Sequence, residues 1–398
     1  MVKFSALKPE LIFFSEYKLG GVQSFHYNLL KYDPFGKIKK TWLLERHALD
    51  EDAIPPQPFR VIPDERIIQF ARGDSYNDKA KKIAAELTDA PGAFITNFLE
   101  ELMAIQYFTS KPKTVFYVCH DEGYVETAVQ YEFLIDVFIA HNPFFYDELN
   151  RLMPHRKDTV FYLPYGIKRA EDVRVHDPKA PLNILYLARI HKLKGIYELP
   201  RMDDHLIKSG IRVNWTIIGD GAGKDAFRDL IKGRDNFNML TLNTQEDVLK
   251  ECSKQDIFIL PSYKDGLPVA MLESMSAGVV PVMYRFNEGI NRIITDEHGF
   301  LTETGNWRGL TDAIEVLEKD RNLLMKMSAS CYNKVKEEYD VRDRAKSYYE
   351  LFYQYDKFKR KKKIKFVRHS GWLDLPFIPS FLRKMARQIK SSFKLRQG

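Results

Sequence analysis

Two acidic residues, Asp265 and Glu273, lie close together in the stretch PSYKDGLPVAMLESMSAGVVPV, which covers positions 261–282. The apolar run at 257–260 predicts a strand just before Asp265. Pro268 predicts the start of a helix and Gly278 its end, because proline is tolerated at the first helical position and glycine is a common C-terminal cap. Asp265 is therefore expected on a loop at the carboxyl end of a strand, and Glu273 about one turn into the following helix.

These positions suit the recognition of a sugar phosphate. The carboxyl ends of strands in α/β sheets bind ligands, and a helix amino terminus attracts phosphate because its unpaired N–H groups and its dipole both favour an anion. Glu273 can accept two hydrogen bonds from vicinal hydroxyls such as those of a ribose. Asp265, with the amides of Gly266 and Leu267, can hold sugar hydroxyls. Acids at this spacing also occur by chance on a solvated loop and a helix surface, so the spacing alone leaves both interpretations open.

Two cations at the end of another expected strand, 183–187, could act on the same ligand. Arg189 offers a bidentate fork and Lys194 a compact charge, and together they can stabilise charge that builds on a diphosphate as a glycosidic bond breaks. The alternative is two exposed cations without a ligand. A glycine-rich turn that includes Gly219 follows the expected strand 213–218 and should lie near the nucleotide. That turn matches neither a dinucleotide fingerprint nor a P-loop.

The first half of the chain offers fewer residues of this kind. Gly20 and Gly21 follow an expected strand at 11–14, where glycine would let the backbone approach a phosphate or sugar closely. A glycine pair in that place is also an ordinary turn. His120 follows the expected strand 114–118, and a lone histidine there is usually satisfied by local hydrogen bonds. A role beside the ligand is the alternative.

Short apolar runs alternate with amphipathic stretches along the chain, which predicts parallel sheets with crossover helices. The polar, proline-ended stretch 166–181 interrupts this alternation and predicts a linker. Further strands are expected at 40–44, 92–96, 137–140, 160–163 and 279–283, and helices near 246–252, 269–277 and 310–319. The sequence therefore predicts an α/β domain at 1–175, a second α/β domain at 182–340, a helix at 341–356 that packs back toward the first domain, and a basic amphipathic tail at 357–398.

This set of motifs resembles the family 4 glycosyltransferases. In that family a proline and a serine follow a strand, and then come an acid–glycine pair, a proline, a second acid and an Ala-Gly turn, all of which 261–282 supplies in order. The stretch 183–195 is similar to the family's element of a strand, an arginine and a Lys-Gly pair. Three positions depart from the pattern: Asp265 replaces the usual Glu, Ala188 the usual Gly, and Tyr165 the usual Asn. The resemblance extends from residue 11 to about 355 and is denser in the second half.

The resemblance implies a GT-B fold, in which two Rossmann-like domains face each other across a cleft. The domain at 1–175 would lie on the acceptor side, and the domain at 182–340 would bind the nucleotide sugar. It also implies transfer of a sugar, with retention of configuration, from a nucleotide-sugar donor such as a UDP- or GDP-sugar to a hydroxyl acceptor. No cofactor and no essential metal ion are implied, and the acidic group at 50–52 is expected to be a solvated loop. The implied catalytic residues are His120, Asp265, Arg189 and Lys194. The implied substrate-binding residues are Gly20, Gly21, Gly219, Gly266, Leu267, Pro268 and Glu273.

The net charge of +7 conceals an uneven distribution. Positions 357–398 hold fourteen Lys and Arg residues and one acid, Asp374, so the rest of the chain is acidic. This argues against a general nucleic-acid-binding protein. A helix expected at 380–396 has one apolar and one basic face, which is typical of an element lying on an anionic membrane surface. The alternatives are a disordered tail or a helix packed on the first domain. Membrane association would predict a lipid-linked acceptor, such as a growing surface polysaccharide.

The remaining features predict a cytoplasmic protein that is peripheral on the inner face of the cell membrane. No apolar run approaches the ~20 residues of a membrane-spanning helix, and the first residues lack the apolar core of a signal peptide. Cys119, Cys252 and Cys331 are too widely spaced for a zinc site or a disulfide framework.

Two other functions fit part of the pattern. One is a different GT-B enzyme, a nucleotide-sugar epimerase or a phosphorylase, although the two cations and the spacing of the two acids favour transfer. The other is a non-catalytic, nucleotide-sugar-binding scaffold at the membrane, which only the departure at Asp265 supports.

Overall fold

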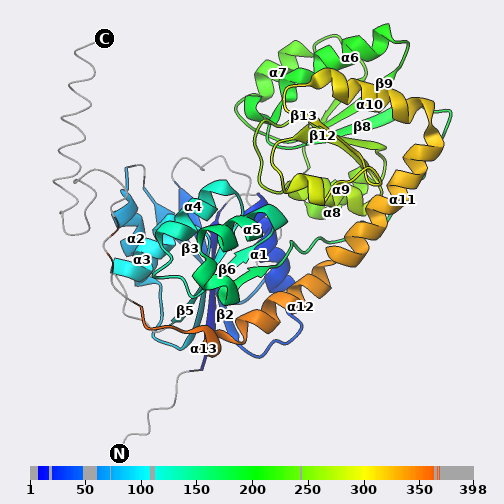
Figure 1. The fold of residues 1–398 in the computed structure, drawn as a ribbon. Helices are drawn as coiled ribbons and strands as arrows, with labels where there is room; N and C mark the ends of the chain where they lie inside the picture. The colour runs from blue at the N-terminus through cyan, green and yellow to red at the C-terminus, as the bar shows by residue number, and fades with distance from the viewer. Residues whose placement is uncertain are drawn as a thin grey trace, which may run out of the picture. The chain divides into compact units, whose positions relative to one another are not determined.

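The computed structural model describes residues 8–17, 20–47, 61–71, 73–107, 113–242, 244–362, 365 and 367. These residues form two compact units (Figure 1). The first unit takes in the described parts of 1–140, 145–162 and 347–398, and the second takes in 141–144 and the described parts of 163–346. Cys119, Cys252 and Cys331 are all buried free thiols.

The first unit is built on a seven-stranded parallel sheet with the order β3-β2-β1-β4-β5-β6-β7. The strands are β1 (Glu10–Glu16), β2 (Lys39–His47), β3 (Glu65–Phe70), β4 (Gly92–Thr96), β5 (Lys113–Cys119), β6 (Val137–Ala140) and β7 (Val160–Tyr162). The helices are α1 (Gly21–Lys31), α2 (Tyr76–Ala85), α3 (Leu99–Tyr107), α4 (Glu122–Gln130) and α5 (Pro143–Leu152). The inner strands are near-continuous apolar runs because helices cover both faces of such a sheet, and β4 and β5 are buried along their whole length.

The second unit repeats this plan with a six-stranded parallel sheet of order β10-β9-β8-β11-β12-β13. Its strands are β8 (Leu182–Leu187), β9 (Val213–Ile218), β10 (Phe237–Leu240), β11 (Ile257–Leu260), β12 (Val280–Arg285) and β13 (Phe300–Glu303). Its helices are α6 (Leu199–Lys208), α7 (Lys224–Leu230), α8 (Gln245–Cys252), α9 (Val269–Ser276), α10 (Trp307–Lys319) and α11 (Arg321–Glu338). Figure 1 shows α8 and α9 on one side of this sheet and α6 and α10 on the other. Both sheets have the doubly wound strand order of Rossmann-like domains, so the predicted α/β class is confirmed.

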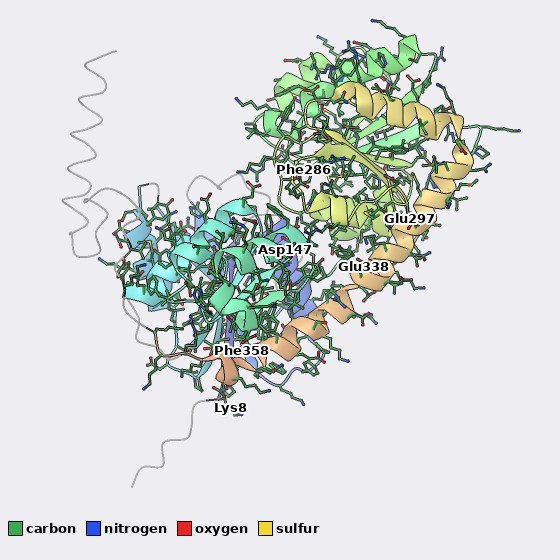
Figure 2. The ribbon with its side chains drawn as sticks, viewed as in Figure 1. Lys8, Asp147, Phe286, Glu297, Glu338 and Phe358 are labelled. Atoms are coloured by element: carbon green, nitrogen blue, oxygen red, sulfur yellow. The ribbon has the colours of Figure 1, made fainter. Side chains whose placement is uncertain are left out.

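The chain returns to the first unit through α12 (Val341–Phe352) and α13 (Tyr355–Phe358). Phe13 of β1 contacts the ring of His26 in α1 and the ring of Phe352 in α12, each with 5.9 Å between ring centroids. The end of α12 and α1 therefore cover the same face of the sheet. Phe358, labelled in Figure 2, packs against Phe116 and Phe161.

Part of the basic segment after α13 is bound to the first unit. Asp136 is fully buried, and its Oδ2 lies 2.8 Å from Lys362 Nζ. Its Oδ1 accepts a hydrogen bond from the backbone N–H of Arg360 at 3.1 Å. A buried carboxylate requires such partners, so at least these two basic residues have structural roles. The amphipathic helix expected at 380–396 lies outside the described residues.

The stretch 166–181, expected to be a linker, is bound along the second unit. Asp256 pairs with Arg174 at 2.8 Å and with His176 at 2.7 Å, and Ile167 forms a parallel bridge with Asp340. Asp256 is 1% exposed, so its charge needs these partners. The main stretch of the second unit, 163–346, therefore includes residues 163–175, which were predicted to lie in the first domain.

Candidate active site

The residues expected to bind the ligand in the second unit follow two adjacent strands. β8 and β11 are neighbours in the sheet, but the chain winds outward from them in opposite directions. Such a topological switch point is where open α/β sheets bind ligands at the carboxyl ends of their strands. Arg189 and Lys194 follow β8, and Asp265 follows β11. The fold thus brings together the two loops that the sequence singled out.

Lys194 and Asp265 form an ion pair at this point. Lys194 Nζ lies 2.6 Å from Asp265 Oδ2, and the two side chains are 23% and 21% exposed. The other oxygen, Oδ1, accepts a hydrogen bond from the N–H of Gly266 at 3.0 Å. Both oxygens of Asp265 therefore have protein partners. The N–H group of Gly266, which was expected to bind a sugar hydroxyl, donates to Asp265 instead. A bound diphosphate would compete with Asp265 for the ammonium group of Lys194.

Backbone contacts hold the two loops against each other. A Cβ atom at Gly195 would lie only 1.9 Å from the carbonyl oxygen of Pro261, so only glycine allows this approach. The hydroxyl of Ser262 lies 3.2 Å from the carbonyl oxygen of Leu193. Asn287, just after β12, donates from Nδ2 to the carbonyl oxygens of Asp265 and Gly266 at 3.0 and 2.9 Å. Sequence reasoning missed Asn287, although its place after a strand at the same edge of the sheet was a usable signal.

Arg189 is exposed, and buried neighbours fix its backbone. The hydroxyl of Tyr186 lies 3.1 Å from the carbonyl oxygen of Arg189. A Cβ atom at Gly219 would lie 2.0 Å from the carbonyl oxygen of Ala188, so the glycine-rich turn packs directly on the end of β8. The structure accounts for Gly219 by this close approach and places it beside the predicted phosphate-binding loop.

Glu273 lies in α9, about one turn from its start, as the sequence predicted. Pro268 is the N-cap, so the helix begins at Val269 and not at the proline, a correction of one position. Glu273 Oε1 accepts a hydrogen bond from Nε2 of Gln245, the first residue of α8, at 2.8 Å. Burial raises the pKa of Glu273. A part-buried carboxyl group beside the first turns of two helices can recognise hydroxyl groups.

His120 of the first unit is held by neighbouring side chains. Its Nε2 lies 2.8 Å from Asn97 Oδ1, and its ring makes edge contacts with the rings of Phe25 and Tyr124 at 5.7 and 5.3 Å. The side chain is buried, with 6% exposed. Asp121 caps α4 by accepting a hydrogen bond from the N–H of Gly123.

Gly20 and Gly21 mark the start of α1, also at the carboxyl end of a strand. Gly20 is the N-cap with an extended backbone, so its conformation does not require glycine. No heavy atom of the described residues lies within 4 Å of the place where a Cβ of Gly20 would be, and both glycines are exposed. Within the described part of the chain, the space in front of Gly20 is therefore open. The acidic residues at 50–52 lie outside the described residues.

Part of the chain is similar to known glycosyltransferases. Residues 168–334 match the family model of the group 1 glycosyl transferases. CapM of Staphylococcus aureus, a capsular polysaccharide biosynthesis glycosyltransferase, is 24% identical over 140 residues, which cover 35% of this chain and 37% of CapM. The UDP-Gal:alpha-D-GlcNAc-diphosphoundecaprenol alpha-1,3-galactosyltransferase of Escherichia coli is 27% identical over 154 residues, which cover 38% of each chain. The alignments thus span well under half the length of these curated relatives.

The fold is similar over most of the chain to that of Anabaena HepE, solved in complex with UDP and glucose. The TM-score is 0.67 at 13% identity, and the match covers 87% of this chain and 100% of HepE. This likeness and the two Rossmann-like sheets show the α/β GT-B fold that the sequence predicted. The family model covers the part of the chain that carries Arg189, Lys194, Asp265 and Glu273. In the part of the chain that the structure describes, no helix is both long and apolar enough to cross a bilayer.

Proposed function

We propose that the chain is a retaining glycosyltransferase that moves a sugar from a nucleotide-sugar donor to a hydroxyl acceptor during the assembly of surface polysaccharide or glycolipid. One observation carries the proposal. Lys194 and Asp265 meet at the switch point of the second unit, in the segment that matches the group 1 glycosyl transferases. CapM is, by its name, a glycosyltransferase of capsular polysaccharide biosynthesis, which supports a role in polysaccharide assembly.

The second unit would bind the donor. The amino terminus of α9 suits a phosphate, while Arg189 and Lys194 can offset the charge of a diphosphate. Glu273 would accept hydrogen bonds from the ribose hydroxyls. HepE was solved with UDP and glucose, which supports a UDP-sugar as the donor. Because two cations can supply the positive charge at the diphosphate, we propose that transfer needs no metal ion and no cofactor.

In the proposed reaction the bond between the anomeric carbon and the diphosphate oxygen breaks as the acceptor oxygen attacks from the same face. A phosphate oxygen of the donor takes the acceptor proton, and no protein nucleophile takes part. Asp265 would lie beside the oxocarbenium-like sugar, and we assign a catalytic role in the same reaction to His120 of the first unit. Arg189 and Lys194 would stabilise the negative charge on the departing diphosphate, the kind of electrostatic contribution that is often the largest in catalysis.

We further propose that the acceptor is lipid-linked and that the protein works at the inner face of the membrane. The E. coli relative acts, by its name, on a diphosphoundecaprenol-linked sugar. The fourteen basic residues at 357–398 would favour an anionic bilayer.

Donor binding tests the proposal, and calorimetry with UDP-, GDP- and ADP-sugars measures it. We expect one nucleotide series to bind and Glu273→Ala to weaken that binding about tenfold or more, because a hydrogen bond to a charged group contributes ~1.5–3 kcal/mol. Glu251→Ala, on α8, is the matched control, since Glu251 pairs with Lys254 at the surface. Unchanged affinity in Glu273→Ala would remove the ribose role, and no binding by any donor would reject the proposed function.

A further inference from the structure

Asn97 links three strand ends in the first unit. It directly follows β4 and is fully buried. In the sheet, β4 lies between β1 and β5. Asn97 Nδ2 donates to the carbonyl oxygen of Phe14 in β1 at 2.7 Å, and Asn97 Oδ1 lies 2.8 Å from Nε2 of His120, which follows β5. One side-chain amide therefore ties the histidine to the neighbouring strands.

The carbonyl group of Phe14 decides which way this amide points. A carbonyl oxygen can only accept a hydrogen bond, so the NH₂ group of Asn97 must face Phe14 and the amide oxygen must face His120. An oxygen in that place requires a hydrogen on Nε2 of His120. In the neutral ring Nδ1 then carries the lone pair and is the nitrogen that takes up a proton.

The main chain of Asn97 is held by Glu101. Glu101 of α3 accepts hydrogen bonds through Oε2 from the N–H groups of Asn97 and Phe98, at 2.5 and 3.1 Å. Glu101 is fully buried, and burial raises its pKa. Asn97 is therefore fixed both at its main chain and at its amide, and it can orient a neighbouring ring.

We propose that Asn97 is a positioning residue for His120, which it holds in the Nε2–H tautomer with Nδ1 as the proton-accepting nitrogen. The inference deepens the proposed function, because it rests on the catalytic role proposed for His120 in sugar transfer. The polar groups around the ring include Asp121, whose carboxylate caps α4, Tyr124 at the ring edge, and Glu101 behind Asn97. The amide oxygen of Asn97 is the partner of Nε2.

The tautomer can be read in the unaltered protein. Selective ¹⁵N labelling of the ten histidines, with His120→Gln to assign the signal, reports which ring nitrogen carries the hydrogen. We expect Nε2 of neutral His120 to be protonated. A neutral ring protonated at Nδ1 would overturn the proposal, and this result does not depend on any variant folding.

A charged replacement for the Asn97 amide tests whether this side chain controls the protonation of His120. Asn97→Asp places a carboxylate beside Nε2, which stabilises the imidazolium ion, so His120 should titrate about one pH unit or more higher. Asn150→Asp adds the same charge on α5 of the same unit, where Asn150 Nδ2 donates to the carbonyl oxygen of Tyr146 one turn earlier, and should leave the titration unchanged. An unshifted titration of His120 in folded Asn97→Asp, in which ¹³C NMR shows the new carboxyl group to be ionised, would overturn the proposal.

Kinetics separate this inference from the proposed function. Asn97→Ala should lower kcat about tenfold, the effect of losing one ordinary hydrogen bond, with little change in the donor KM. An unchanged kcat would reject the positioning role while sugar transfer itself stands. An enzyme that turns over no nucleotide sugar would reject the proposed function, whereas the tautomer is measured without a donor.

Discussion

At the scale of single residues, the ion pair between Lys194 and Asp265 changes what each group can contribute. The sequence assigned the lysine to the diphosphate and the aspartate to the sugar. In the structure they bind each other at 2.6 Å, so a donor diphosphate that engages Lys194 would compete with Asp265 for its charge. In the proposed reaction the carboxylate would then be available beside the sugar, where positive charge would develop.

This exchange of partners predicts the behaviour of Asp265→Asn. Loss of the competing carboxylate should tighten the binding of UDP alone about two- to fivefold, since a partly exposed ion pair contributes ~0.5–1 kcal/mol. The same change should lower kcat. Calorimetry with UDP and initial rates at saturating donor measure the two effects.

Asp225→Asn is the matched control, because Asp225 pairs with Arg228 on the surface of α7 in the same unit. It should change neither quantity. If Asp265→Asn binds UDP no more tightly than the wild type, Lys194 does not exchange Asp265 for the diphosphate.

At the scale of elements, the strands that were predicted correctly from the sequence are mainly the buried ones. The bounds of β4, β6, β9 and β11 agree with the predicted ones, because these inner strands are apolar on both faces. Three strands were missed, and each is the outermost strand of its sheet: β3, β10 and β13. These three edge strands are partly solvated and mix polar with apolar residues, so no apolar run marks them, whereas the fourth edge strand, β7, lies in the apolar run predicted at 160–163.

The same reasoning explains which site residues could be found. Arg189, Lys194, Asp265 and Glu273 follow strands or begin helices that the sequence located. Asn287 and Asn97 act by binding the backbone or side chains of neighbouring strands, and the order of strands in a sheet cannot be read from local patterns. The place of Asn287 after a strand was a usable signal, but the bonding partners of both residues became visible only in the three-dimensional fold.

The contact between Asp136 and the C-terminal segment gives a prediction at this scale. Asp136 Oδ2 accepts from the N–H of Val115 at 2.7 Å and pairs with Lys362. Asp136→Asn should release residues 359–362 and let trypsin cleave there several-fold faster, because an amide cannot replace the charge that holds Lys362. Mass spectrometry of timed digests locates the cuts. Asp158→Asn, an exposed position in the same unit, should keep the wild-type pattern. Identical digests of all three proteins would contradict the proposed role of Asp136.

At the scale of the whole molecule, His141 should make stability depend on pH. Burial lowers the pKa of His141 from 6.5 to about 3, while its ring stacks on Tyr165 with 3.8 Å between centroids. The unfolded chain then binds more protons than the folded one below about pH 6.5, so this contribution to stability is complete above that pH and is lost as the pH falls toward 3.

Through this group the free energy of unfolding changes by up to ~1.4 kcal/mol per pH unit. Urea unfolding at pH 7, 6 and 5 should therefore show the stability advantage of the wild type over His141→Phe shrinking as the pH falls. Parallel pH dependence of the two proteins would contradict the assignment of a buried neutral histidine.

Membrane association is also a property of the whole molecule. Since Arg360 and Lys362 bind Asp136, a chain shortened to residue 367 keeps this contact and removes seven of the fourteen basic residues. The full chain should float with vesicles that contain phosphatidylserine and not with neutral ones, because each cation near an anionic surface contributes ~1 kcal/mol. Equal flotation of the full and shortened chains would remove residues 368–398 from the membrane contact.

Sugar transfer itself is the central claim, and the most direct measurement is the release of nucleoside diphosphate from the donor that binds, with and without a hydroxyl acceptor. The account predicts slow release from the wild type alone and faster release with an acceptor. Lys194→Ala should lower the rate at saturating donor at least tenfold, because the developing diphosphate charge loses a cation. A protein that binds its nucleotide sugar but releases no diphosphate under either condition would contradict the account and favour a binding scaffold instead.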